Sequence, residues 1–231
     1  MKVLCRNAIV LLALLISACA SHKVTQAPEL TFDTQMLGKS TQSNGVHMIA
    51  KPIYKEEELE SYFDDNLLKY SILPVQMNIS NKGYDGNLLF SPSSISMTTA
   101  DGATCPQLSL EQIYDEVKKS YGRTVGWTVA FGAIGAGVSA ANVATTNNKI
   151  RRDYEGKMIN KDVLPQGGET EGFVFFSVPE KTESLDGWEL SLLLKDSLND
   201  KRVAVNCPMS GQIDLDSTQA SNSPEPDSSE F

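Results

Sequence analysis

The stretch Ile72–Ser80, which reads I-L-P-V-Q-M-N-I-S, decides the class of fold. Two sets of side chains alternate along it: Leu73, Val75, Met77 and Ile79 on one side, and Ile72, Pro74, Gln76, Asn78 and Ser80 on the other. A period of two residues is typical of a β-strand. Asn81-Lys82-Gly83 follows as a turn, so the pattern predicts a strand that enters a hairpin-type connection.

Further strands are predicted on both sides of this stretch. Val46–Tyr54 precedes it, and Pro52 favours an edge position for that strand because proline cannot donate to a ladder. Later strands are expected at Asn87–Phe90, Ile95–Thr99, Gly172–Val178, Trp188–Leu194 and Arg202–Asn206. Short strands with turns between them predict a mainly β protein, a β-sandwich with an inserted α-helical segment.

Two segments have helical spacing instead. Lys55–Tyr70 carries apolar residues at helical intervals and acids in its first turn, which favours a helix. Ser109-Leu110-Glu111-Gln112 is a capping box. The serine side chain caps the start of the helix, and the glutamine side chain three residues later reaches back to the backbone N–H of the serine. It predicts a helix to about Ser120, the first part of an insert that spans 109–150.

The insert continues with an unusual segment, Thr124–Asn148, in a run that has no charge between Arg123 and Lys149. Its small residues recur every four positions and would form one helix face: Gly132, Ala136, Ala140 and Ala144. Three interpretations stay open. The face packs on the sandwich, it associates with a partner or a second copy, or the helix enters a membrane.

Two stretches resemble small immunoglobulin-like bacterial lipoproteins. One is Asp65–Ser80, D-N-L-L-K-Y-S-I-L-P-V-Q-M-N-I-S, and the other is Leu164–Phe176, L-P-Q-G-G-E-T-E-G-F-V-F-F. The Gly/Ala-rich insert fits the same pattern. The resemblance covers about 46–207 and implies an immunoglobulin-like β-sandwich over that range. It implies no catalytic residue.

The N-terminus has the pattern of an export signal. Lys2 and Arg6 form a basic head, and the apolar run Ala8–Ile16 is too short to span a bilayer. The run ends in L-I-S-A-C, which resembles the lipobox of bacterial lipoproteins. The resemblance implies loss of residues 1–18 and acylation of Cys19. Several acyl chains on one residue anchor a protein firmly to a membrane.

The residues after Cys19 indicate where the anchor is held. Ala20 and Ser21 stand where an aspartate often marks retention in the inner membrane. We therefore expect a lipid-anchored protein of the outer membrane, on its periplasmic face. Residues 19–45 are polar and without periodicity, and they are expected to form a flexible tether. Residues 208–231 are acidic and are expected to form a disordered tail, either solvated or in contact with a basic partner.

Charge and cysteine usage narrow the function further. The formal net charge is −9, and it becomes −11 when Lys2 and Arg6 leave with the signal. Such a chain is not expected to bind nucleic acid, or to adhere to anionic lipid by charge alone. Cys105 and Cys207 are the pair that remains after Cys5 is lost and Cys19 is acylated. In an oxidising compartment they form a disulfide or remain two separate buried thiols.

The sequence has no recognisable catalytic or cofactor motif, and no cofactor or metal is expected. The two histidines, His22 and His47, lack zinc-ligand spacing, and neither a nucleophile elbow nor a phosphate-binding loop occurs. The hypothesis is a non-enzymatic, membrane-anchored lipoprotein, a structural or accessory subunit of a cell-envelope assembly such as a secretion system. It would contact protein partners or itself. The alternative is an envelope hydrolase or small-ligand carrier whose site forms only in three dimensions.

Overall fold

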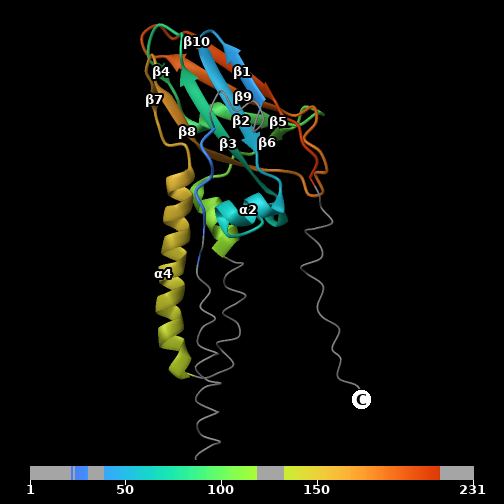
Figure 1. Ribbon diagram of the computed structural model, residues 1–231, viewed down its shortest axis with the longest axis vertical. Helices are drawn as coiled ribbons and strands as arrows, with labels where there is room; N and C mark the ends of the chain where they lie inside the picture. The colour runs from blue at the N-terminus through green and yellow to red at the C-terminus, as the bar shows by residue number, and fades with distance from the viewer. Residues whose placement is uncertain (1–21, 23, 31–38, 119–132, 214–231) are drawn as a thin grey trace, which may run out of the picture.

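The computed structural model describes residues 22, 24–30, 39–118 and 133–213 (Figure 1). Two antiparallel sheets face each other, so the predicted β-sandwich with an inserted helical segment is confirmed. The longer helices lie at one end of the sandwich, and one of them runs well away from it (Figure 1). The predicted signal segment, Cys19, Gly132 and the residues beyond 213 lie outside the described part.

Sheet one has four strands in the order β1-β2-β3-β8. Their bounds are β1 Lys39–Ser43, β2 Val46–Pro52, β3 Ile72–Asn81 and β8 Glu169–Ser177. Sheet two has the order β6-β5-β9-β4-β7, and β10 pairs with the other edge of β9. Its strands are β4 Leu88–Leu89, β5 Ile95–Thr98, β6 Thr104–Cys105, β7 Val163–Leu164, β9 Glu189–Asp196 and β10 Arg202–Pro208.

The remaining elements are helical. They are α2 Glu56–Phe63, the 3-10 helices η1 Leu67–Tyr70 and η2 Pro92–Ser94, a helix over 110–118, and α4 Ala133–Lys157. The capping box is present, since Ser109 N–H donates to Gln112 Oε1 at 2.9 Å and Gln112 N–H reaches Ser109 Oγ at 3.4 Å. Helix α4 ends at Lys157, which is seven residues past the predicted end of the insert at 150.

The predicted flexible tether was expected to extend to residue 45, but residues 39–43 form strand β1 of sheet one. Asn44 and Gly45 both have positive φ, 48° and 81°, and they join β1 to β2 with Ser43 opposite Val46. A two-residue Asn-Gly loop is the strongest local signal for a hairpin because both positions of its turn need positive φ. The sandwich therefore begins at Lys39.

The helix predicted over Lys55–Tyr70 is divided. Asp64 takes a left-handed conformation, φ 58°, and ends α2, and Asn66 then caps η1 by accepting from the Leu68 N–H at 3.2 Å. Helical spacing continues through the break, which is why the sequence pattern did not reveal it. The break matters for the site below because it places the Asp64 carboxylate at the end of α2.

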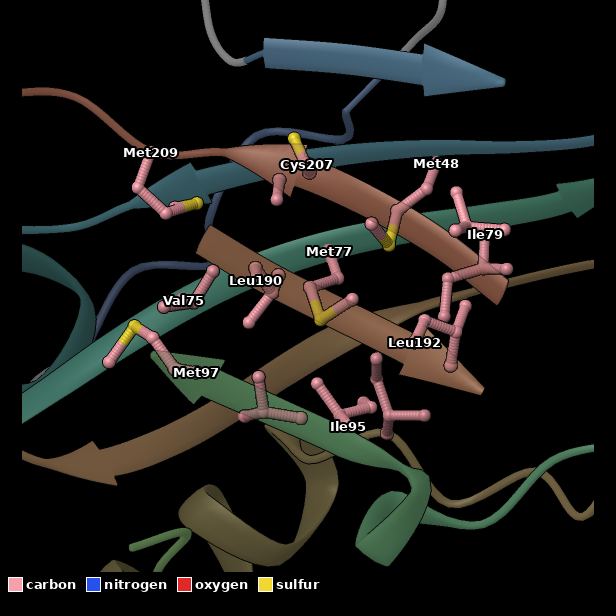
Figure 2. Close-up of a cluster of buried hydrophobic side chains, with 14 of the residues drawn as sticks. Met48, Val75, Met77, Ile79, Ile95, Met97, Leu190, Leu192, Cys207 and Met209 are labelled. Atoms are coloured by element: carbon pink, nitrogen blue, oxygen red, sulfur yellow. The ribbon is translucent and has the colours of Figure 1, made fainter. Parts of the chain in front are cut away.

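The main core lies between the sheets and is rich in sulfur. Met48 and Met77 come from sheet one, Met97 from sheet two and Met209 from the segment after β10 (Figure 2). Each of these four side chains is at most 3% exposed. Methionine is flexible at three torsions, so it fills the irregular space where two twisted sheets meet.

Cys105 and Cys207 are both buried and no disulfide joins them, so of the two alternatives left open by the sequence the structure has two separate thiols. Cys105 pairs with Met97, Met97 with Leu190, and Leu190 with Cys207. The thiols thus stand on one row of sheet two, three strand spacings apart, which is about 14 Å. A disulfide requires Cα atoms within about 7 Å.

The predicted tail also begins later than expected. Met209 and Ile213 are 3% and 6% exposed, and their N–H groups donate to the carbonyls of Trp188 and Glu183, each at 2.8 Å. Because these apolar side chains complete the core, the sandwich extends to residue 213 instead of 207.

A second core forms where the helices cover the outer face of sheet one. Phe63 of α2 is fully buried there, with its ring centre 5.2 Å from that of Phe173 and 5.6 Å from that of Phe175. Tyr154 of α4 stacks at 5.5 Å from Phe63. This aromatic cluster fixes the C-terminal end of α4 and the end of α2 side by side, which builds the site described next.

Candidate functional site: the N-terminal strap

The first described residues form a strap across the helices and sheet one. The N-terminal strap is His22 with residues 24–30, and it runs between α4 and α2 toward the sandwich (Figure 1). Thr25 N–H donates to the carbonyl of Ser61 at 2.9 Å, and the two hydroxyls lie 2.6 Å apart. This part of the predicted flexible tether is therefore packed on the domain.

His22 is held between two carboxylates from different elements. Its Nε2 lies 3.2 Å from Asp153 Oδ2 on α4, and its Nδ1 lies 3.3 Å from Asp64 Oδ2 at the end of α2. The first contact has hydrogen-bond geometry, whereas the second is close enough for an ion pair but is not aligned as a hydrogen bond. The side chain is 4% exposed. We call His22, Asp64 and Asp153 the histidine clamp.

Lys157 completes the charge arrangement on α4. It pairs with Asp153 one turn away and lies over the Phe63 ring, 5.7 Å from its centre. Burial alone would raise the pKa of Asp153, but hydrogen bonds from His22 and Lys157 outweigh it and hold that pKa below its usual value. Burial also lowers the pKa of Lys157, and its pairing with Asp153 only partly offsets this effect.

The other end of the strap is bound through its backbone. Gln76 Nε2 donates to the Pro28 carbonyl at 2.7 Å and to Glu171 Oε1 at 3.0 Å. Asn78 Nδ2 donates to the Leu30 carbonyl at 2.7 Å, and the Leu30 N–H donates back to Glu171 Oε1 at 2.9 Å. Leu30 is 1% exposed. The outer, polar side of β3 therefore has a partner in this structure, and that partner is the chain's own N-terminus.

The small-residue face predicted as an interface falls largely on α4. Ala136, Ala140 and Ala144 lie in its N-terminal half, the end that is distant from the sandwich in Figure 1, and Gly132 lies outside the described residues. The helix docks by its C-terminal half, where Ile150 and Tyr154 are buried. None of the helices in the described ranges is both long and apolar enough to cross a membrane.

An open groove lies beside the helix over 110–118. Its volume is about 390 Å³. The lining residues are Tyr70, Ile72, Leu108, Gln112, Asp115, Glu116 and Ser177. No histidine or cysteine is among them, and the described part of the chain holds no cluster of three or more His, Cys, Asp or Glu arranged to bind a metal ion. The ionisable side chains of the groove are those of Tyr70, Asp115 and Glu116.

Sequence reasoning placed His22 in the tether and gave it no role. Its partners lie 42 and 131 residues away, and no local pattern links them. Gln76 and Asn78 were correctly assigned to one side of their strand, but what covers that side could not be read from the alternation. One usable signal was overlooked: Asn44-Gly45, which predicts that the chain is already in a sheet before residue 46.

Comparison with known proteins adds little. No protein-family model matches the chain, and no curated protein matches it. Among solved structures, the yjhA protein from Bacillus subtilis has a TM-score of 0.36 and 9% identity, over 68% of this chain and 79% of that one. The secreted protein MPT63 from Mycobacterium tuberculosis has a TM-score of 0.30 and 12% identity, over 71% and 92%. Likenesses this weak indicate neither a shared family nor a shared function.

Proposed function

We propose that this protein is a non-enzymatic lipoprotein, anchored through Cys19 in the outer membrane and facing the periplasm. Its role would be that of a structural or accessory subunit of a cell-envelope assembly. The observation that carries the proposal is the burial of His22 on the domain, three residues after the expected acylation site. Three residues span at most about 11 Å. An acylated Cys19 would hold the sandwich close to the bilayer, whereas a long flexible tether would let it move away.

A short link of this kind suits a subunit with a defined place. It restricts the positions that the sandwich and α4 can take relative to the membrane, and so lowers the entropy lost when a neighbouring protein binds. A carrier that must cross the periplasm gains nothing from such a restriction.

The contact element of the proposal is the N-terminal half of α4. It projects from the sandwich, and its sequence has no charge before Lys149. Small residues at four-residue spacing let another helix approach closely. The partner would be a helix of another envelope protein or of a second copy of this chain.

Labelling with radioactive palmitate tests the anchor. The wild-type chain should incorporate the label and sediment with membranes, and a Cys19→Ser variant should do neither. Equal labelling of the two, or labelling of neither, would show that the placement is wrong.

A matched pair of substitutions tests the contact element. Ala136→Leu with Ala140→Leu should reduce the recovery of cross-linked partners by about tenfold or more, because two isobutyl side chains in place of methyl groups prevent close helix approach. Ala204→Leu, the same chemical change at an exposed position of β10, serves as the control. Equal recovery from both variants would remove α4 from the proposal.

A further inference from the structure

We propose that the outer side of β3 is a docking site for an extended segment of another polypeptide, which displaces the N-terminal strap. We call Gln76 and Asn78 of β3, together with Glu171 of β8, the strap site. The strap occupies this site in the structure, but it matches the hydrogen-bonding groups there incompletely. The strap site is separate from the contact element on α4, and the inference does not depend on the anchor.

Two buried amide oxygens of the strap site lack a donor. Gln76 and Asn78 are 2% and 1% exposed, and within the described part of the chain neither Gln76 Oε1 nor Asn78 Oδ1 accepts a hydrogen bond. The orientation of each amide is fixed because its nitrogen has only oxygens as partners. Gln76 Nε2 donates to the Pro28 carbonyl and to Glu171, and Asn78 Nδ2 likewise donates to a carbonyl and a carboxylate. Buried polar atoms without a partner are rare, so two at one site indicate a missing group.

The missing donor at Gln76 has a cause in the sequence of the strap. In an extended segment, the N–H and the C=O of one residue point to the same side. Leu30 directs both groups at the strap site, since its N–H donates to Glu171 and its carbonyl accepts from Asn78. Two residues earlier, the carbonyl of Pro28 accepts from Gln76, but proline has no N–H to offer to the oxygen of the same amide. Any other residue at this position would supply that donor.

The strap site binds mainly the backbone of its occupant. Pro28 and Glu29 are exposed, whereas Leu30 is 1% exposed. The site therefore tolerates many side chains at the first two positions and requires an apolar one at the third. Main-chain hydrogen bonds combined with a buried position for one side chain are a common way of binding extended peptides. The inferred partner is an extended segment with an aliphatic residue at the third position and a residue other than proline at the first.

The incomplete fit makes the strap a replaceable occupant. A buried acceptor that is left without a donor weakens a contact by about fivefold or more. The strap nevertheless occupies the site in the free protein, because its attachment to the domain gives it a high effective concentration. A partner segment that supplies the missing N–H compensates for this advantage and binds in place of the strap.

Peptide binding to the lipid-free mature chain (residues 19–231 with Cys19→Ser) tests the inference. The probe is a fluorescein-labelled, C-terminally amidated peptide of residues 22–30 with Pro28→Ala, and fluorescence anisotropy measures its affinity. The matched peptide carries N-methylalanine at this position, which has a carbon on the nitrogen, as proline does, and lacks the N–H. Leu30→Asp in the protein frees the strap site, because its carboxylate would be buried close to that of Glu171.

The Leu30→Asp chain should bind the alanine peptide about fivefold or more tighter than the N-methylalanine peptide. The chain without this substitution should bind the alanine peptide about tenfold or more weakly than the Leu30→Asp chain, because its own strap competes. Equal affinities of the two peptides, equal affinities of the two chains, or no saturable binding to the Leu30→Asp chain would each overturn the proposal.

A pair of glutamine substitutions assigns the difference between the peptides to the strap site. In the Leu30→Asp chain, Gln76→Met removes the amide at a similar side-chain volume, so the two peptides should bind equally. Gln42→Met makes the same change at an exposed position of β1 and should keep the difference. A difference that persists in the Gln76→Met chain would show that the N–H does not bind at Gln76, and would overturn the proposal.

Amide hydrogen exchange replaces the Leu30→Asp chain if circular dichroism shows that this variant does not fold. A millimolar excess of the alanine peptide should lower the protection of the Leu30 N–H, which bonds to Glu171. The N–H of Val75, in the ladder between β3 and β8, should stay protected. Unchanged protection of Leu30 would overturn the proposal. None of these chains can be acylated, so the outcome is independent of palmitate labelling.

Discussion

Gly45→Ala should be among the most destabilising small changes in the sandwich. Gly45 has φ 81°, and an added Cβ would lie 2.3 Å from the Gly83 carbonyl carbon and 2.4 Å from the Tyr84 nitrogen. Both are backbone atoms, so neither can rotate away. The left-handed conformation costs an alanine about 1–2 kcal/mol, and the stiffer unfolded chain returns about 0.4–1 kcal/mol. Displacing the neighbouring turn that contains Gly83 and Tyr84 adds about 1–3 kcal/mol, by analogy with overpacked cores.

The expected loss is therefore about 2–4 kcal/mol in the free energy of unfolding, or roughly 5–15 °C in Tm for a domain of this size. Urea denaturation of the lipid-free mature chain measures it. Gly102→Ala is the matched control: its φ is 89°, and nothing lies within 4 Å of an added Cβ. It should lose about 1 kcal/mol or less. Equal losses in the two variants would refute the argument that the two turns are in contact at Gly45.

Two further predictions concern the core and its edge. Cys105 and Cys207 should react with a thiol reagent only after the lipid-free chain is unfolded, because burial shields both thiols and raises the pKa of Cys105. No reductant should be needed for this reaction. A requirement for reductant would contradict the separation of the two cysteines across the strands of sheet two. Tyr84 Oη donates to Asp196 Oδ2 at 2.6 Å, and this hydrogen bond holds the pKa of the Asp196 carboxyl below its usual value. The resulting stabilisation of the fold is therefore present above about pH 4 and is lost as the pH falls below about 4. Tyr84→Phe should therefore narrow the difference in unfolding free energy between pH 7 and pH 3, and an unchanged difference would show that the bond does not matter.

Much of the local structure could be predicted because its causes are local. The alternation in Ile72–Ser80 gave a strand that the structure extends by one residue to Asn81, and the capping box at Ser109 formed with both of its hydrogen bonds. Where local signals conflicted, the boundaries were wrong. Helical spacing persists across Asp64, whose left-handed conformation ends α2, and it concealed the break.

The apolar residues of the tails were misjudged for a related reason. Leu30 and Ile213 stand in the sequence without periodicity, whereas Met209 continues the two-residue alternation of Val203, Val205 and Cys207, a signal that was overlooked. A lone apolar residue has no pattern, so only the presence of a matching surface decides whether it is buried. For Leu30 that surface is the outer side of β3, whose own covering could not be inferred from its alternation.

The sequence by itself determined that this chain builds a β-sandwich with a helical insert, because a two-residue period, turn residues and helix caps act within a few positions of one another. It also carries the lipobox-like motif at Cys19, which needs no fold to be recognised. Only the tertiary structure decided that Cys105 and Cys207 stand three strands apart, since strand order is set by which apolar faces pack together. It likewise decided that His22 lies between Asp64 and Asp153, because the aromatic cluster around Phe63 brings the end of α2 to the side of α4.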